Sequence, residues 1–194
     1  MRSRPPLRSA AAGIIIAILA VLVLAADQLA KTVAIDTLPP ERVVPVIGEA
    51  LQFYLVRNPG AAFSLGEGVT WIFTIALAVV AAIIVYLAVR RVRSRLWAVV
   101  LGLLLGGVLG NLTDRLLREP GFPVGHVVDF ISTPWMMPAI YNVADIFIVS
   151  MMISVAILVL VGLRLDGTRE TKPARTPDAG AADDAPSGAE PGTR

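Results

Sequence analysis

Four long apolar runs restrict what this chain can fold into. An α-helix rises about 1.5 Å per residue, so about 20 residues cross the ~30 Å hydrocarbon core of a bilayer. Runs of this length cover about residues 13–35, 69–89, 96–117 and 141–163. We therefore expect an all-α membrane protein with four transmembrane helices.

The composition supports this expectation. Apolar residues make up 56% of the 194 residues and charged residues only 16%, and the mean hydropathy is +0.73, which is outside the usual range of soluble domains. The length suits a few spans with modest loops and is too short for a large transporter built from two repeated halves. Residues 13–165 should form a single four-helix membrane domain.

Basic residues cluster where the positive-inside rule can be applied. One cluster, Arg2, Arg4 and Arg8, precedes the first run. A second, Arg90, Arg91, Arg93 and Arg95, separates the second run from the third. A third, Arg164, Arg169, Lys172 and Arg175, follows the fourth run. Cytoplasmic loops are enriched in Lys and Arg, so we expect the basic segment 1–12 and both termini in the cytoplasm, with loops 36–68 and 118–140 outside. These clusters explain the net charge of +2 without a nucleic-acid partner.

Two segments outside the runs have distinct compositions. The strings RVVPVI (42–47) and ALQFYLV (50–56) are rich in Val, Tyr and Phe and predict short strands of a small extracytoplasmic β-sheet or loop subdomain. Residues 166–194 are rich in Ala, Pro, Gly, Asp and Thr, which predicts a disordered cytoplasmic tail. The first run also fits a cleavable signal peptide ending at Ala25-Ala26, but cleavage would leave three spans and an unmatched basic turn at 90–95.

Ionisable residues near the outer ends of the runs are the candidate functional residues, because charge at membrane depth is costly. Asp27 and Lys31 have the i, i+4 spacing of a helical ion pair, and a structural role is as plausible as a functional one. In the third run, glycines at every fourth position would let a neighbouring helix approach closely. The glycine faces end in three polar residues: Asn111, Asp114 and Arg115. Asp114 and Arg115 could form a structural ion pair with each other.

Two further carboxylates have no basic residue beside them. Asp129 stands among apolar residues in the string VVDF, and Asp145 begins the fourth run three residues after Asn142, on the same helical face. Asp145 could simply cap that helix, and the usual explanation of two buried acids is structural. The alternative is a pair of acids that work together.

Other chemistries are weaker. The chain has no cysteine and a single histidine, His126, so thiolate and zinc catalysis lack their usual ligands. A Ser/Lys dyad would need Ser64 and Lys31, which no motif holds together. A proton or cation carrier would spread its acids through the membrane depth, whereas these cluster at the outer ends.

Five motifs in order resemble those of one family, lipoprotein signal peptidase (signal peptidase II, prolipoprotein signal peptidase). The matching segments span residues 27–145: DQLAK at 27–31, NPGAAF at 58–63, GGVLGNLTDR at 106–115, VVDF at 127–130 and YNVAD at 141–145. The resemblance implies an aspartic endopeptidase of the bacterial inner membrane that needs no cofactor or metal. It implies that the enzyme cuts a prolipoprotein just before a cysteine that carries diacylglycerol.

The resemblance also suggests residue roles. Asp129 and Asp145 would be the catalytic dyad, because two close carboxylates share a proton and can act as general base and general acid. Asn58, Asn111, Arg115 and Asn142 would position the dyad or the substrate. Asp27, Lys31 and Asp114 would be supportive. We expect a monomer whose partners are diacylglyceryl-modified prolipoproteins and membrane lipid.

Overall fold

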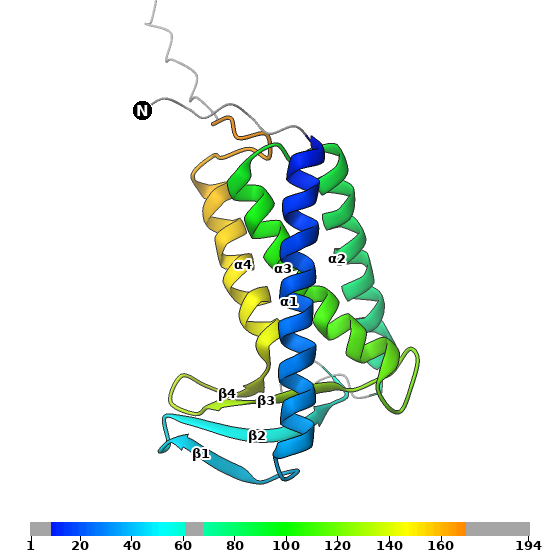
Figure 1. The fold of residues 1–194 in the computed structure, drawn as a ribbon, viewed down its shortest axis with the longest axis vertical. Coiled ribbons are helices and arrows are strands. Elements are labelled where there is room, and N and C mark those ends of the chain that lie inside the picture. Colours follow the sequence, from blue (N-terminus) through cyan, green and yellow to red (C-terminus); the bar gives the residue numbers. More distant parts are fainter. Residues whose placement is uncertain (1–8, 61–67, 170–194) are drawn as a thin grey trace, which may run out of the picture.

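The computed structural model describes residues 9–60 and 68–169. In this part of the chain, four helices lie side by side and a four-stranded antiparallel sheet crosses one end of the bundle (Figure 1). The elements in chain order are α1 Ser9–Thr37, β1 Val43–Ile47, β2 Leu51–Asn58, α2 Thr70–Arg90, α3 Arg95–Leu117, β3 Val127–Thr133, β4 Met137–Tyr141 and α4 Val143–Leu160. All four helices are long and apolar enough to cross a membrane, as the sequence predicts.

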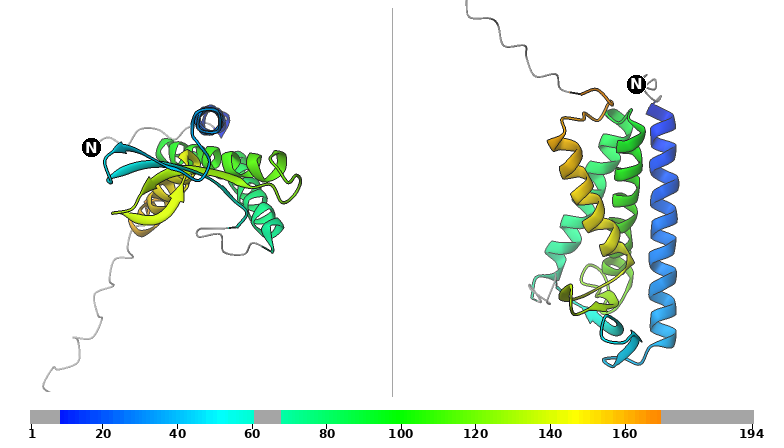
Figure 2. Two further views of the ribbon diagram at one scale, coloured as in Figure 1. Left: turned by 90° about the horizontal axis from the view of Figure 1, so that it is seen from below. Right: turned by 90° about the vertical axis from the view of Figure 1, so that its left-hand side faces the viewer.

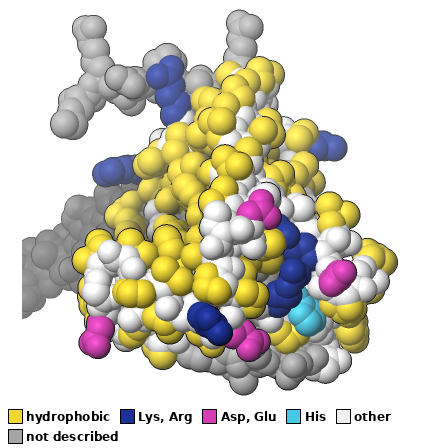
Figure 3. All heavy atoms as spheres, turned by 60° about the horizontal axis from the view of Figure 1, so that its bottom comes forward, with side chains coloured by type: hydrophobic (Ala, Val, Ile, Leu, Met, Phe, Trp, Pro, Cys, Tyr) yellow, Lys and Arg dark blue, Asp and Glu magenta, His cyan; other side chains and the backbone are white. Residues whose placement is uncertain are grey.

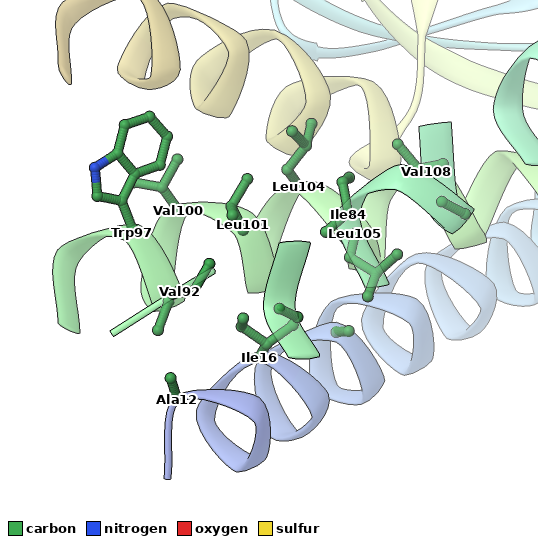
Figure 4. Close-up of a cluster of buried hydrophobic side chains, with 14 of the residues drawn as sticks. Ala12, Ile16, Ile84, Val92, Trp97, Val100, Leu101, Leu104, Leu105 and Val108 are labelled. Carbon is green, nitrogen blue, oxygen red and sulfur yellow. The ribbon is translucent and has the colours of Figure 1, made fainter. Parts of the chain in front are cut away.

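Helix α3 is the centre of the bundle. Of its most apolar segment, 72% is buried in the protein, compared with 22% for α1 and α2 and 11% for α4. The core side chains around it come from several elements, including Ile16 on α1, Ile84 on α2 and Leu104 on α3 (Figure 4). Large apolar side chains on the outer helices are exposed, which suits contact with lipid rather than water.

The predicted glycine faces of α3 hold two neighbours at close range. A Cβ atom on Gly106 would lie 2.5 Å from Val23 Cβ of α1, and one on Gly107 would lie 2.7 Å from the carbonyl oxygen of Ala144 in α4. Small residues thus let the backbones of α1 and α4 approach adjacent faces of the same helix. This contact brings Asp27 and Asp145 near the polar end of α3.

Replacing Gly106 with alanine should therefore loosen the α1–α3 contact. Overpacking of a tight core costs about 1–3 kcal/mol, and here the added methyl would overlap a β-branched side chain. Gly13→Ala is the matched control, because a Cβ there meets nothing within 4 Å. Thermal unfolding in detergent should show a lower Tm for G106A only; equal Tm values for the two variants would contradict the packing argument.

The sheet joins both loops into one layer at the end of the bundle. Its order is β1-β2-β3-β4, and the β2–β3 register places Val56 opposite Asp129. The two strands predicted at 42–47 and 50–56 are present as β1 and β2, but β3 and β4 in the second loop were not foreseen. Helix α4 begins at Val143 because Tyr141 ends β4 and Asn142 caps the helix.

Helix α1 supports the sheet from one flank of the bundle (Figure 2). Its 29 residues correspond to about 44 Å, so it is longer than the ~30 Å hydrocarbon core. The extra length lets Ala34 pack with Leu55 of β2 and with Val128 and Phe130 of β3 in a second apolar cluster. The sheet is thereby attached to the helices at a fixed height.

Candidate active site

Asp129 lies on β3, with an exposed fraction of only 2%. Its Oδ2 accepts a hydrogen bond from Asn58 Nδ2 at 3.0 Å, and its Oδ1 accepts one from Asn142 Nδ2 at 2.7 Å. Asn58 ends β2, the strand paired with β3, and Asn142 lies between β4 and α4. Amide donors from both sides therefore fix the orientation of this carboxylate.

Asp145 occupies the first turn of α4. Its Oδ2 accepts the backbone N–H of Asn142 at 3.1 Å, while its own N–H donates to Asn142 Oδ1 at 3.0 Å, which forms a capping box. The capping role considered from the sequence is thus present. The other oxygen, Oδ1, accepts a hydrogen bond from Asn111 Nδ2 at 2.7 Å, so Asp145 also belongs to a polar network reaching α3.

The two carboxylates line one cavity of about 350 Å³ between the helices and the sheet. Asn142 links them, since its side chain contacts Asp129 and its backbone contacts Asp145. Most of the wall is apolar and comes from α2, β4 and α4: Phe73, Ala76, Leu77, Met137, Ala139, Ile140, Tyr141 and Val149. Two acids in a largely apolar cavity are suited to proton transfer.

Burial changes the acidity of Asp129. Desolvation, followed by the nearby charge of Asp145, raises the pKa of Asp129 from 3.8 to about 7. The hydrogen bonds from Asn58 and Asn142 favour the charged form and lower the pKa in part. Asp129 can therefore hold a proton near neutral pH while a second carboxylate stands in the same cavity.

Lys31 lies behind the cavity in a fully buried charged cluster. Its Nζ is 2.8 Å from Asp27 Oδ2 and 2.8 Å from Asp114 Oδ2, and all three side chains have an exposed fraction of 0%. The Asp27–Lys31 pair expected from the i, i+4 spacing is thus found, with a second carboxylate added from α3. Lys31 also donates to Asn111 Oδ1 at 3.0 Å, which connects the cluster to Asp145.

Each carboxylate of this cluster holds a backbone amide beside one cavity acid. Asp114 Oδ2 accepts the N–H of Val128 at 3.1 Å, and Asp27 Oδ1 accepts the N–H of Ala144 at 2.9 Å. Val128 directly precedes Asp129, and Ala144 directly precedes Asp145. A single ammonium therefore pairs with the two groups that anchor both segments of the cavity.

Arg115 does not pair with Asp114. Its guanidinium instead donates to the backbone carbonyls of Asn58, Pro59, Gly60 and Gly125, and the contacts with Pro59 and Gly125 are 2.9 and 3.1 Å long. Arg115 thereby holds the turn after β2 against the segment that leads into β3. Its Nε is buried and has no hydrogen-bond partner within the described residues.

Two polar residues of this network were not identified as site residues from the sequence. Arg118 Nε contacts Asp114 Oδ1 at 2.7 Å, a pair whose i, i+4 spacing was a usable signal. Gln28 Nε2 contacts Asp114 Oδ1 at 3.1 Å and the Gly110 carbonyl at 3.1 Å, and no local pattern indicates these contacts between α1 and α3.

The rival chemistries gain no support from the geometry. Lys31 is fully buried between two carboxylates, which leaves its amine occupied, and Ser64 lies outside the described residues. His126 lies in the connection between α3 and β3. Within residues 9–60 and 68–169, no group of three His, Cys, Asp or Glu side chains could hold a metal ion.

Comparison with known proteins identifies the family. The family model described as "Signal peptidase (SPase) II" matches residues 19–163. The lipoprotein signal peptidase of Leifsonia xyli subsp. xyli is 46% identical over 182 residues, which are 94% of this chain and 82% of that protein. The lipoprotein signal peptidase of Rhodococcus jostii is 48% identical over 153 residues, or 79% of this chain and 76% of that one.

A solved structure agrees with these sequence matches. It is described as a bacterial membrane enzyme, is 27% identical, and superposes with a TM-score of 0.70 over 88% of this chain and 100% of its own. Four membrane-crossing helices, the small sheet and the sequence matches lead to the same assignment. The chain is a bacterial membrane protein of the signal peptidase II family, the proteases that cleave the signal peptides of prolipoproteins.

Proposed function

We propose that Asp129 and Asp145 are the catalytic pair with which this chain hydrolyses prolipoprotein signal peptides. The observation that carries the proposal is that the two carboxylates line one largely apolar cavity and are held there by amide groups. In the described residues, neither acid has a salt bridge within 4.0 Å. Cations instead pair with the supporting acids Asp27 and Asp114.

The chemistry follows from one shared proton. The ionised carboxylate takes a proton from a water molecule, whose oxygen attacks the scissile carbonyl carbon. The protonated carboxyl donates its proton to the carbonyl oxygen, which gives a neutral tetrahedral intermediate. When the C–N bond breaks, the proton taken from water passes to the leaving amine. One hydroxyl of the intermediate gives its proton to the carboxylate that protonated the carbonyl oxygen, which yields the carboxylic acid product and restores the pair. The raised pKa of Asp129 favours this residue as the protonated member.

The neighbouring polar residues position the pair in this proposal. Asn142 holds both acids, Asn58 and Asn111 each orient one, and Arg115 fixes the turn that carries Asn58. The supporting cluster of Asp27, Lys31 and Asp114 acts through backbone amides and Asn111.

The position of the cavity suits a substrate anchored by lipid. Its wall includes residues near the sheet-side ends of α2 and α4, so acyl chains on the substrate cysteine could stay in the bilayer while the peptide bond enters from the side. We propose cleavage immediately before a diacylglyceryl-modified cysteine, without a metal or other cofactor. The basic clusters favour cytoplasmic termini and an extracytoplasmic cavity, and we propose that the monomer is the active form.

The pH dependence tests the role of Asp129. Since Asp129 has a pKa of about 7, cleavage should decline as the pH rises through about 7, where the pair loses its proton. Asn58 stabilises the charged form of Asp129, so Asn58→Ala should raise this pKa and move the alkaline limb to higher pH. The measurement is the initial rate of cleavage of a diacylglyceryl-modified prolipoprotein in detergent, with a chelator present.

The direction of the change in N58A is decisive. An unchanged alkaline limb, or one that moves to lower pH, would contradict the assignment of the proton to Asp129. Asp36→Asn is the control, because Asp36 is exposed at the sheet-side end of α1 and does not line the cavity. Its pH profile should match that of the wild type.

A further inference from the structure

Two turns at one end of the sheet expose large apolar side chains. The β3–β4 turn carries Trp135 and Met136, which are 72% and 55% exposed, and the β1–β2 turn follows Val46 and Ile47, which are 47% and 65% exposed. Trp135 Nε1 donates to the Ala50 carbonyl at 2.8 Å, so the two turns touch. Segment 134–138, Pro-Trp-Met-Met-Pro, contains no charged residue, and Glu49 is the one charge in segment 45–50.

The β3–β4 turn should lie at the depth of the membrane boundary. The 18 residues of α4 span about 27 Å, close to the ~30 Å hydrocarbon core, so Val143 lies near the edge of that core. A single residue, Asn142, separates α4 from β4, and β4 runs sideways across the end of the bundle (Figure 1). Its five residues extend about 17 Å, so the turn lies beside α4 and not far beyond it.

The surroundings of the turns match those of a lipid-facing surface. Figures 1 and 2 show both turns on the α4 side of the molecule. Exposed apolar side chains on α4, including Ile146 and Val149, continue toward this end. Viewed from the sheet end, hydrophobic side chains cover much of the surface around the charged ones (Figure 3).

We propose that the β3–β4 turn inserts Trp135 and Met136 into the leaflet at the sheet end of the bundle, with the β1–β2 turn resting on the headgroups. Tryptophan favours this interface because its ring is apolar and its N–H needs a partner, which Ala50 supplies here. The insertion is a second membrane attachment besides the four helices. It holds β4, which lines the cavity, at a fixed depth, and it does not depend on which residues are catalytic.

Spin labels can measure the depth of the turn, because the chain has no cysteine and each cysteine variant has one labelling site. Met136→Cys is the test position, and Arg42→Cys, exposed just before β1, is the matched control. In phosphatidylcholine–phosphatidylglycerol liposomes, the label at 136 should be relaxed several-fold more by oxygen than by a water-soluble nickel chelate. The label at 42 should show the reverse.

A second probe avoids the bias of an apolar label. A variant with Trp71→Phe and Trp97→Phe keeps Trp135 as its single tryptophan, and phospholipids brominated near the top of the acyl chain should quench most of its fluorescence. Access of nickel at position 136 equal to that at 42, or Trp135 fluorescence that brominated lipid leaves unchanged, overturns the proposal. Protection of position 136 from both relaxants also overturns it, since this indicates a protein contact instead of lipid.

Discussion

Replacing either cavity acid with its amide, Asp129→Asn or Asp145→Asn, should lower kcat for prolipoprotein cleavage by about 10²–10⁴-fold or more, since each change removes a general acid or base. Each amide keeps the shape of the side chain but only one acceptor oxygen, so one of the two hydrogen bonds that the carboxylate accepts is kept and the other is lost. Because the two acids act as a unit, the double variant should lose no more activity than the less active of the two single variants. Gel-based cleavage assays in detergent measure all three.

The control for this experiment is a change of charge outside the cavity. Asp36→Asn removes an exposed carboxylate at the sheet-side end of α1 and should leave the rate of cleavage unchanged. Thermal unfolding of each variant establishes that it is folded. If folded D129N and D145N cleave at the wild-type rate, the catalytic assignment fails, although membership of the family does not depend on it.

The second large effect is expected on stability, at Lys31. Lys31→Met keeps most of the side-chain volume but leaves Asp27 and Asp114 buried without their common cation. Removing one partner of a buried ion pair typically costs about 3–5 kcal/mol, and here one ammonium serves two carboxylates. We expect a large decrease in Tm in detergent, together with loss of cleavage because the Asn111 contact disappears as well.

Charge matching separates this explanation from a simple packing defect. Adding Asp27→Asn to Lys31→Met removes one uncompensated charge and should recover part of the lost stability. Arg118→Gln should have a smaller effect than Lys31→Met, because the Arg118 side chain is 20% exposed and Asp114 keeps Lys31. A wild-type Tm for K31M, or no recovery in the double variant, would argue against the cluster as an electrostatic support.

Local patterns predicted much of this architecture. Apolar run length is enough to find four membrane helices, because a bilayer sets the length of a span. The Asp27–Lys31 pair and the close approach at Gly106 follow from helical periodicity alone, and the structure contains both. The resemblance in five motifs led to the family that the comparisons confirm.

Contacts between distant segments could not be predicted in the same way. The string at 127–130 is continuously apolar apart from Asp129, so it lacks the alternation that indicates a half-buried strand; β3 is in fact buried on both faces at that point. Arg115 was weighed as a partner of its neighbour Asp114, yet it bonds to carbonyls more than 50 positions earlier in the chain. Sequence spacing carries no information on such contacts.

The dependence of the cavity on both ends of the chain has a consequence for biosynthesis. Lys31 and Asp27 come from α1, Asn111 from α3 and Asp145 from α4, the last of the four described helices to leave the ribosome. The polar contacts around the two cavity acids are therefore complete only after α4 has docked on α3 and α1. A nascent chain with three inserted helices carries Asp129 without Asp145, so the catalytic pair proposed above would keep the protease latent until its own insertion is complete.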